Sequence, residues 1–276
     1  MRLSKHHGLR NDFLVLLDEV NGRPVDIDAG WARRLCDRRS GIGADGLIHG
    51  AGAAGGSTAD VVMHLWNADG SRAEMSGNGI RCLAQAVTRS RGAAETTVVA
   101  DTDVGSRVLV VTPGPTKDEV SVRVDMGDVG PGPATGGLLL PLAAKESATA
   151  DLGNPHLVVW VDDPAVVDLA AVGPEIERHF PDGINVEVVA PGVDPGSVSL
   201  RVWERGVGIT EACGTGACAA AAMATRWGMV DATTVRIDMP GGSVVVELIH
   251  GRAVLTGPAV HIADLDVPDP ETADRG

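Results

Sequence analysis

The hydrophobic and polar positions of this chain predict short strands around one long helix, and they do so twice. Runs of β-branched residues predict the strands, and an apolar run that ends near glycine predicts the first helix. In the first half the expected strands are 61–66, 96–100 and 107–112, and the helix is 79–91. In the second half the expected strands are 199–203, 233–238 and 243–249, and the helix is 217–227.

An internal repeat connects these two patterns. When the sequence is shifted by 137 residues, residues 65–109 align with 202–246 without a gap, and 14 of these 45 positions are identical. The same shift matches Asp45-Gly46 with Asp182-Gly183, and a shift of 143 matches Asn11 with Asn154. We interpret the chain as two versions of one structural unit, because long similarity at a fixed shift is typical of internal repeats.

A proline-rich polar stretch over residues 112–118 is the best candidate for a linker between the two units. We therefore expect the boundary near residue 115. This gives an N-terminal domain over residues 1–115 and a C-terminal domain over residues 116–258.

Composition narrows the class of protein. The chain has 276 residues, of which 44% are hydrophobic, so it can bury a globular core. Its 37 acidic and 23 basic residues give a net charge of −14, which repels nucleic acids and anionic membranes. Four cysteines are too few for a disulfide scaffold, and no apolar run reaches the length of a membrane helix. We expect a cytoplasmic protein with reduced thiols.

The candidate chemistry lies just before the two predicted helices. The segments Met75-Ser-Gly-Asn-Gly-Ile-Arg-Cys82 and Ala212-Cys-Gly-Thr-Gly-Ala-Cys218 occupy equivalent places in the repeat. Glycines let the backbone approach a ligand closely, and the free N–H groups of a helix start favour anions such as carboxylates. A thiol there is expected to have a lowered pKa, so Cys213 is a candidate base. Ser76 holds the matching place in the first half.

Other catalytic classes fit poorly. The sequence contains no Gly-x-Ser-x-Gly elbow, no phosphate-binding loop and no His-Glu-x-x-His pair, and its histidines do not cluster as metal ligands. Cys36, Cys82 and Cys218 lie among apolar residues and are expected to be buried packing residues. His156 follows a turn in the half that carries Cys213. It is either a core histidine or a group that tunes the thiol.

Eight motifs follow one another along nearly the whole chain. They are Gly8-Leu-Arg-Asn11-Asp-Phe, Gly41-Ile-Gly-Ala-Asp45-Gly, Asn67-Ala-Asp-Gly-Ser, Ser76-Gly-Asn-Gly79, Gly153-Asn-Pro-His156, Gly183-Ile-Asn185-Val, Trp203-Glu-Arg-Gly206 and Ala212-Cys-Gly-Thr-Gly216. In this set and order the chain resembles the diaminopimelate epimerase family, cofactor-independent enzymes of lysine and cell-wall precursor synthesis. The resemblance implies an α/β (α+β) fold of two pseudo-symmetric domains, each a β-barrel-like sheet around a central helix. It also implies that residues 259–276 return to the first domain.

The resemblance implies a reaction and a set of residues. The reaction is two-base proton transfer at the α-carbon, which interconverts LL- and meso-diaminopimelate, with Cys213 at the position of the proton acceptor. His156 and Glu204 match positions that adjust the acidity of the thiol. The positions that match substrate-binding residues are Asn11, Asn67, Gly77, Asn78, Asn154, Asn185, Glu204, Arg205, Gly214 and Thr215.

One departure falls on the catalytic pair, because Ser76 stands where the family has its first cysteine. A serine hydroxyl can protonate a basic carbanion, but acting as a base requires an alkoxide, which is hard to form near neutral pH. Three alternatives follow: an epimerase with a Ser/Cys pair, a lyase in which Ser76 protonates a β-leaving group, or a variant that only binds. We predict the first, because the substrate-binding motifs all persist.

The predicted ligand is therefore a small amino acid, with catalysis by Cys213 and Ser76 and without cofactor or metal. One alternative is a racemase or dehydratase of another amino acid, such as a proline derivative. Another is a non-catalytic amino-acid binding protein. The resemblance is compatible with a homodimer, but the chain lacks the tyrosine that helps to pair subunits in some members of the family.

Overall fold

The computed structural model describes residues 1–268, which form two compact units. The first unit contains residues 1–124 and 258–268, and the second contains residues 125–257. Two strands, β8 and β17, each pass from one unit into the other.

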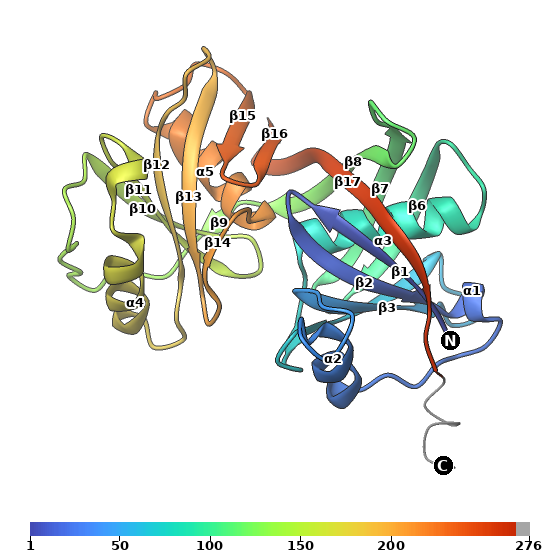
Figure 1. The fold of residues 1–276 in the computed structure, drawn as a ribbon. Coiled ribbons are helices and arrows are strands. Elements are labelled where there is room, and N and C mark those ends of the chain that lie inside the picture. Colours follow the sequence, from blue (N-terminus) through green and yellow to red (C-terminus); the bar gives the residue numbers. More distant parts are fainter. Residues whose placement is uncertain (269–276) are drawn as a thin grey trace. The chain divides into compact units, whose positions relative to one another are not determined.

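The first unit is a closed ring of strands around a helix (Figure 1). Its strands are β1 (Arg2–Gly8), β2 (Asn11–Leu17), β3 (Gly46–Gly52), β4 (Val61–Asn67), β5 (Arg72–Ala73), β6 (Thr96–Thr102), β7 (Gly105–Pro113), β8 (Glu119–Asp128) and β17 (Arg252–Asp266), and its helices are α1 (Asp18–Asn21), α2 (Ala29–Cys36) and α3 (Gly77–Ser90). Among the described strands, the ring of eight runs β1-β2-β3-β4-β6-β7-β8-β17 and returns to β1. The β2–β3 and β4–β6 pairs are parallel.

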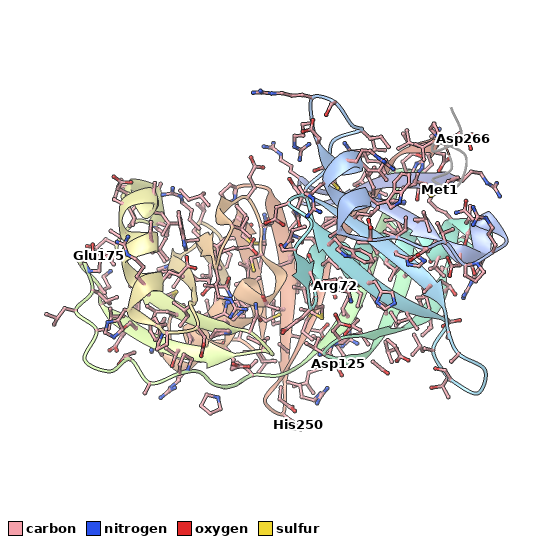
Figure 2. All side chains as sticks on the ribbon, turned by 90° about the horizontal axis from the view of Figure 1, so that it is seen from below. Met1, Arg72, Asp125, Glu175, His250 and Asp266 are labelled. Atoms are coloured by element: carbon pink, nitrogen blue, oxygen red, sulfur yellow. The ribbon has the colours of Figure 1, made fainter. Side chains whose placement is uncertain are left out.

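Helix α3 is the centre of this unit. Its residues 77–88 are buried on every face, and it contacts β1, β2, β3, β6 and β7. The strands supply alternating side chains, as in β7, where Leu109 and Val111 are buried while Val108 and Val110 are exposed. The ring closes where the start of β1 pairs with the end of β17. Figure 2 accordingly shows Met1 and Asp266 close together.

The second unit repeats this order of pairing. Its additional elements are β9 (Gly130–Pro131), β10 (Glu146–Asp151), β11 (Pro155–Trp160), η1 (Pro164–Val166), α4 (Leu169–His179), β12 (Asn185–Pro191), β13 (Ser197–Glu204), β14 (Gly208–Thr210), α5 (Gly214–Arg226), β15 (Thr234–Met239) and β16 (Gly242–Ile249). The strands pair in the order β9-β10-β11-β12-β13-β15-β16-β17. Parallel pairs again occur at equivalent places, β11–β12 and β13–β15. The alanine-rich helix α5 is buried from Gly214 to Ala221.

All eight elements expected from the sequence are present, and the repeat matches β4, α3, β6 and β7 with β13, α5, β15 and β16. One detail of the repeat was wrong. Phe13 pairs with Gly46 and His156 pairs with Asn185, so Gly46 is equivalent to Asn185 rather than to Gly183. The connection after β12 is shorter than its counterpart after β3, and this difference changes the shift by two residues.

The boundary between the units also differs from the expected one. The proline-rich stretch over residues 112–118 is the turn between β7 and β8, closed by the Gly114 N–H bond to the Glu119 carbonyl, and it lies inside the first unit. The division comes instead within β8, after Val124. Residues 258–268 belong to the first unit, and the part of the expected returning segment after residue 268 lies outside the described residues. Of the helices described here, none is both long and apolar enough to span a membrane.

Candidate active site

The two central helices begin with the same local geometry. Ser76 caps α3, with backbone angles of −133° and 125°, and its Oγ accepts a hydrogen bond of 3.0 Å from the Gly79 N–H. Cys213 caps α5 with angles of −129° and 121°, and its Sγ accepts a bond of 3.4 Å from the Gly216 N–H. The structure therefore places Ser76 and Cys213 in equivalent capping roles, each bonding a helix N–H that has no partner within the helix.

Cys213 has two further polar partners. Its Sγ lies 3.5 Å from the Thr215 Oγ1, and it interacts electrostatically with the carboxylate of Glu204 at the end of β13. The Thr210 hydroxyl, on β14, donates to the same carboxylate. Only 6% of Cys213 is exposed.

The resting acidity of Cys213 differs from the expected one. Burial, followed by the charges of Glu204 and Glu187, raises the pKa of the Cys213 thiol well above its usual range, and the bonds from Thr215 and Gly216 oppose this rise. Burial likewise raises the pKa of the Glu204 carboxyl. The expectation that the helix start alone lowers this thiol pKa was wrong, because desolvation and two nearby carboxylates outweigh the two donors.

His156 belongs to the same cluster but is linked to the sulfur indirectly. Its Nδ1 lies 2.7 Å from the Glu187 Oε1, and its Nε2 lies 3.1 Å from the Asn154 Oδ1. The Asn154 Nδ2 in turn donates to the Thr215 Oγ1 over 3.2 Å. His156 and Glu187 are completely buried. Four of the residues expected from the sequence therefore form one chain of hydrogen bonds that includes Cys213.

Asn185 and Arg205 shape the loop beside Glu204. The Asn185 Nδ2 donates to the Pro155 carbonyl, and its Oδ1 accepts from the Arg205 N–H, each over 2.9 Å. This amide therefore joins the starts of β11 and β12 to the turn that follows Glu204. Gly214 is the buried first residue of α5.

The expected residues of the first unit form a separate cluster. The Asn78 Nδ2 donates to the Asn11 Oδ1 over 3.2 Å, and the equivalent pair of the second unit is bonded in the opposite direction, with Asn154 donating to Thr215. The Asn78 Oδ1 accepts from Arg81, which also bonds the Gly77 carbonyl. Ser76, Gly77, Asn78 and Asn11 thus lie together at the start of α3.

Asn67 lies at the end of β4 and takes the place that Glu204 has in the repeat. Its Nδ2 donates to the Ser71 Oγ across a tight turn. The position equivalent to the carboxylate beside Cys213 therefore carries an uncharged amide in the first unit.

An ionic network next to Asn11 was not expected from the sequence. Asp12 pairs with Arg38 at 2.6 Å and with Lys5 at 2.9 Å, and Arg38 also pairs with Asp45, which accepts from the Asn11 side chain. Burial acts to raise the pKa of Asp12, but the hydrogen bonds from Arg38 and Lys5 hold this pKa below its usual value. The network fixes the orientation of Asn11.

Glu187 is the main residue that the sequence reasoning missed. A signal was present, because a glutamate interrupts the apolar run Asn185-Val-Glu-Val-Val, and a charge in a buried strand needs a partner. The same signal applies to Arg81 within the apolar part of α3. Cys36, Cys82 and Cys218 are buried free cysteines, as expected. Within residues 1–268, no group of three or more potential metal ligands is found.

The comparisons with known proteins agree with this arrangement. A family model described as diaminopimelate epimerase matches residues 3–130 and 148–262. The chain belongs to the diaminopimelate epimerase family. The diaminopimelate epimerase of Synechococcus elongatus is 38% identical over 280 residues, which cover 95% of this chain and 96% of the relative. That of Rhizorhabdus wittichii is 40% identical over 273 residues, covering 95% and 93%.

Membership in the diaminopimelate epimerase family confirms the family that the motifs indicated, and the two-part α/β fold is confirmed with it. A solved structure of a phenazine biosynthesis protein of the PhzF family, from Bacillus anthracis, has a TM-score of 0.73 and covers 97% of this chain and 99% of its own. At 14% identity this likeness concerns the fold alone.

Proposed function

We propose that this protein is an isomerase that interconverts LL- and meso-diaminopimelate without a cofactor, in the synthesis of lysine and cell-wall precursors. The observation that carries the proposal is the Cys213 cap of α5, whose sulfur contacts a helix N–H and the Thr215 hydroxyl and lies in the field of the Glu204 carboxylate. Family membership over nearly the whole chain supports the choice of reaction.

In this proposal the Cys213 sulfur, as thiolate, takes the α-proton. The α-carbon–hydrogen bond breaks, its electron pair stays on the α-carbon, and an S–H bond forms. The carboxylate of Glu204 supports this step, because the ammonium group of an amino acid placed beside it offsets the negative charge that raises the thiol pKa. The free N–H groups at the helix start suit the α-carboxylate.

Ser76 is the proposed second proton-transfer residue. Its O–H bond breaks as a hydrogen is delivered to the α-carbon, and the alkoxide then recovers a proton from water. Ser76 already accepts the Gly79 N–H, which stabilises negative charge on its oxygen. The substrate-binding residues in this proposal are those expected above, led by Asn78 with Asn11 and by Thr215 with Asn154.

The test uses LL-diaminopimelate in deuterium oxide with the wild-type chain, Cys213→Ala and Ser76→Ala. Wild type should form the meso isomer with deuterium at the inverted centre. Cys213→Ala should lose about 10²–10⁴-fold in rate, the range for removal of a positioned proton-transfer group. Wild-type protein that binds the substrate but leaves the α-hydrogen in place would overturn the proposal.

A racemase or dehydratase of another amino acid is not favoured, because the relatives at 38% and 40% identity are diaminopimelate epimerases. We also propose a cytoplasmic location and a homodimer. Four free cysteines support the location, since a reducing compartment keeps thiols free. Cell fractionation tests the location, and light scattering during gel filtration tests the dimer.

A further inference from the structure

Glu187 is a charged residue in a place where the fold does not require one. It lies in the middle of β12, between Val186 and Val188, and its side chain has no exposed surface. Its Oε1 is 2.7 Å from the His156 Nδ1, and its Oε2 has no hydrogen-bond partner among the described residues. Burying a carboxylate is costly even when it is paired. Its presence therefore calls for a role.

The contacts of His156 bear on the protonation of its ring. The Nδ1 faces a carboxylate oxygen, and the Nε2 faces the Oδ1 of Asn154. In this arrangement the Nδ2 of the same amide donates to the Thr215 Oγ1. Both ring nitrogens thus face acceptor oxygens, a set of contacts that favours a doubly protonated ring paired with Glu187.

The direction of these bonds continues to the sulfur. The Thr215 oxygen already accepts from Asn154, so its own hydrogen is free for the Cys213 Sγ, 3.5 Å away. The Gly216 N–H is the second donor to this sulfur. Two donors favour the thiolate over the thiol. Each hydrogen bond from His156 to Cys213 therefore donates toward the sulfur, and the buried Glu187 sets this direction.

The first unit shows that the scaffold folds without this arrangement. A side chain added at Gly216 would meet the Glu187 Oε1 at 2.6 Å, and one added at the equivalent Gly79 would meet the Cδ1 of Ile48 at 3.2 Å. By the register of the strands, Phe13 takes the place of His156. Two apolar residues, Phe13 and Ile48, therefore take the places in the first unit that the His156–Glu187 pair has in the second.

We propose that Glu187 is a positioning residue for proton transfer at Cys213, keeping His156 doubly protonated and thereby directing the Thr215 hydroxyl to the sulfur through Asn154. This inference rests on the proposed function only in giving the thiolate a use. The charged groups that face the sulfur are Glu204 on β13, Glu187 on β12 and His156 on β11.

Replacement of Glu187 by glutamine separates the hydrogen-bond effect from the charge effect. In Glu187→Gln the histidine becomes neutral, its Nε2 needs a donor, and the Asn154 amide turns to supply one. Thr215 then donates to the amide oxygen instead of to the sulfur. Because the ion pair and its neutral replacement both have zero net charge, the change in the Cys213 thiol comes mainly from the lost donor.

The probe is iodoacetamide, with the labelling rate of Cys213 followed by mass spectrometry as a function of pH and without substrate. We expect Glu187→Gln to move the profile up by about one pH unit, which slows labelling about tenfold at a given pH below the midpoint. Thr215→Val should give the same shift, and Thr215→Ser should restore the wild-type profile. Ile48→Val, at the equivalent place in the first unit, should leave it unchanged, and Cys213→Ala gives the background.

A double variant tests the route. If Glu187 acts through Thr215, Glu187→Gln with Thr215→Val shifts the profile no further than either change alone. Additive shifts, or an unchanged profile in Glu187→Gln, contradict the proposal. A measurement on the wild type guards against variants that fail to fold: nitrogen-15 spectra should show both His156 ring nitrogens protonated at pH 8, and a neutral ring overturns the inference. Because no step uses diaminopimelate, these results are independent of the epimerase assay.

Discussion

The two helix starts of this protein share a backbone but differ in what lies beneath them. Ser76 and Cys213 cap their helices with backbone angles that agree within a few degrees, and each accepts the N–H of a glycine three residues later. By strand register, Phe13 and Ile48 of the first unit take the places that His156 and Glu187 have in the second. Both units keep the cap and the glycine, which the fold therefore needs. Only the second unit has the His156–Glu187 pair, which we infer that the Cys213 sulfur needs.

The two units also differ in the partners of a buried histidine. His6, in the first unit, bonds the Gln85 side chain and Ser4, and burial lowers its pKa to about 4, so it is neutral near pH 7. His156 faces a carboxylate with one nitrogen and an amide oxygen with the other. A neutral partner thus accompanies a neutral ring in one unit, while an acidic partner faces the ring in the other.

Changes that make the second unit resemble the first should have the largest effect on stability. A first change should be destabilising, and a second change should restore the lost stability. Glu187→Ile leaves His156 buried without its acidic partner and should cost about 3–5 kcal/mol in free energy of unfolding. Adding His156→Phe reproduces the apolar pair of the first unit. The double variant should recover wild-type stability or exceed it, because replacing a whole buried ion pair is often neutral or stabilising. Urea denaturation measures both, and a double variant no more stable than Glu187→Ile would contradict the equivalence of the two sites.

Acid should act on the first unit through His6. Its pKa falls from 6.5 to about 4 on folding, so the unfolded chain binds more protons than the folded chain between these values. This contribution to stability is complete above about pH 6.5 and decreases as the pH falls to 4, by a total of about 3 kcal/mol.

The matched variant is His6→Gln, which keeps a polar group but does not titrate in this range. The measurement is the difference in free energy of unfolding between wild type and variant at pH 7 and at pH 4.5. Wild type should lose more stability than the variant over this interval. Parallel losses would mean that His6 is not neutral in the folded protein.

Giving the first unit a thiol should sharpen the functional comparison. In Ser76→Cys the cap geometry is kept, because Cys213 already caps α5 in the same conformation. A thiol is a far stronger acid than a hydroxyl, so we expect the rate of diaminopimelate inversion to rise about 10²-fold, the lower end for a well-matched proton-transfer group. Inversion rates of wild type and variant, measured with each isomer as substrate, check this. A slower variant would show that serine is the adapted residue at this position.

Much of this contrast could be predicted from the sequence, and the missing part has a physical cause. The shift of 137 residues matched α3 with α5 and Ser76 with Cys213, because both lie in one ungapped segment. It could not match Ile48 with Glu187, because the loops after β3 and β12 differ in length and the equivalence appears only in the strand register. The raised thiol pKa was also out of reach, since it depends on burial and on carboxylates from two other strands.

The smallest effect concerns the turns that precede Asn11 and Asn154. In the second unit the residue before Asn154 is Gly153, with a φ of 92°, whereas in the first unit the equivalent residue is Arg10, with a φ of 68°. A left-handed conformation costs a residue with a side chain about 1–2 kcal/mol, and glycine adopts it freely. Arg10→Gly should therefore raise the free energy of unfolding by about 1 kcal/mol, less than the full relief because glycine also gains freedom in the unfolded chain. Gly153→Arg is the reciprocal change and should be destabilising by a similar amount. Urea denaturation of the two variants tests the pair, and a loss of stability in Arg10→Gly would show that the arginine side chain contributes contacts worth more than the backbone strain.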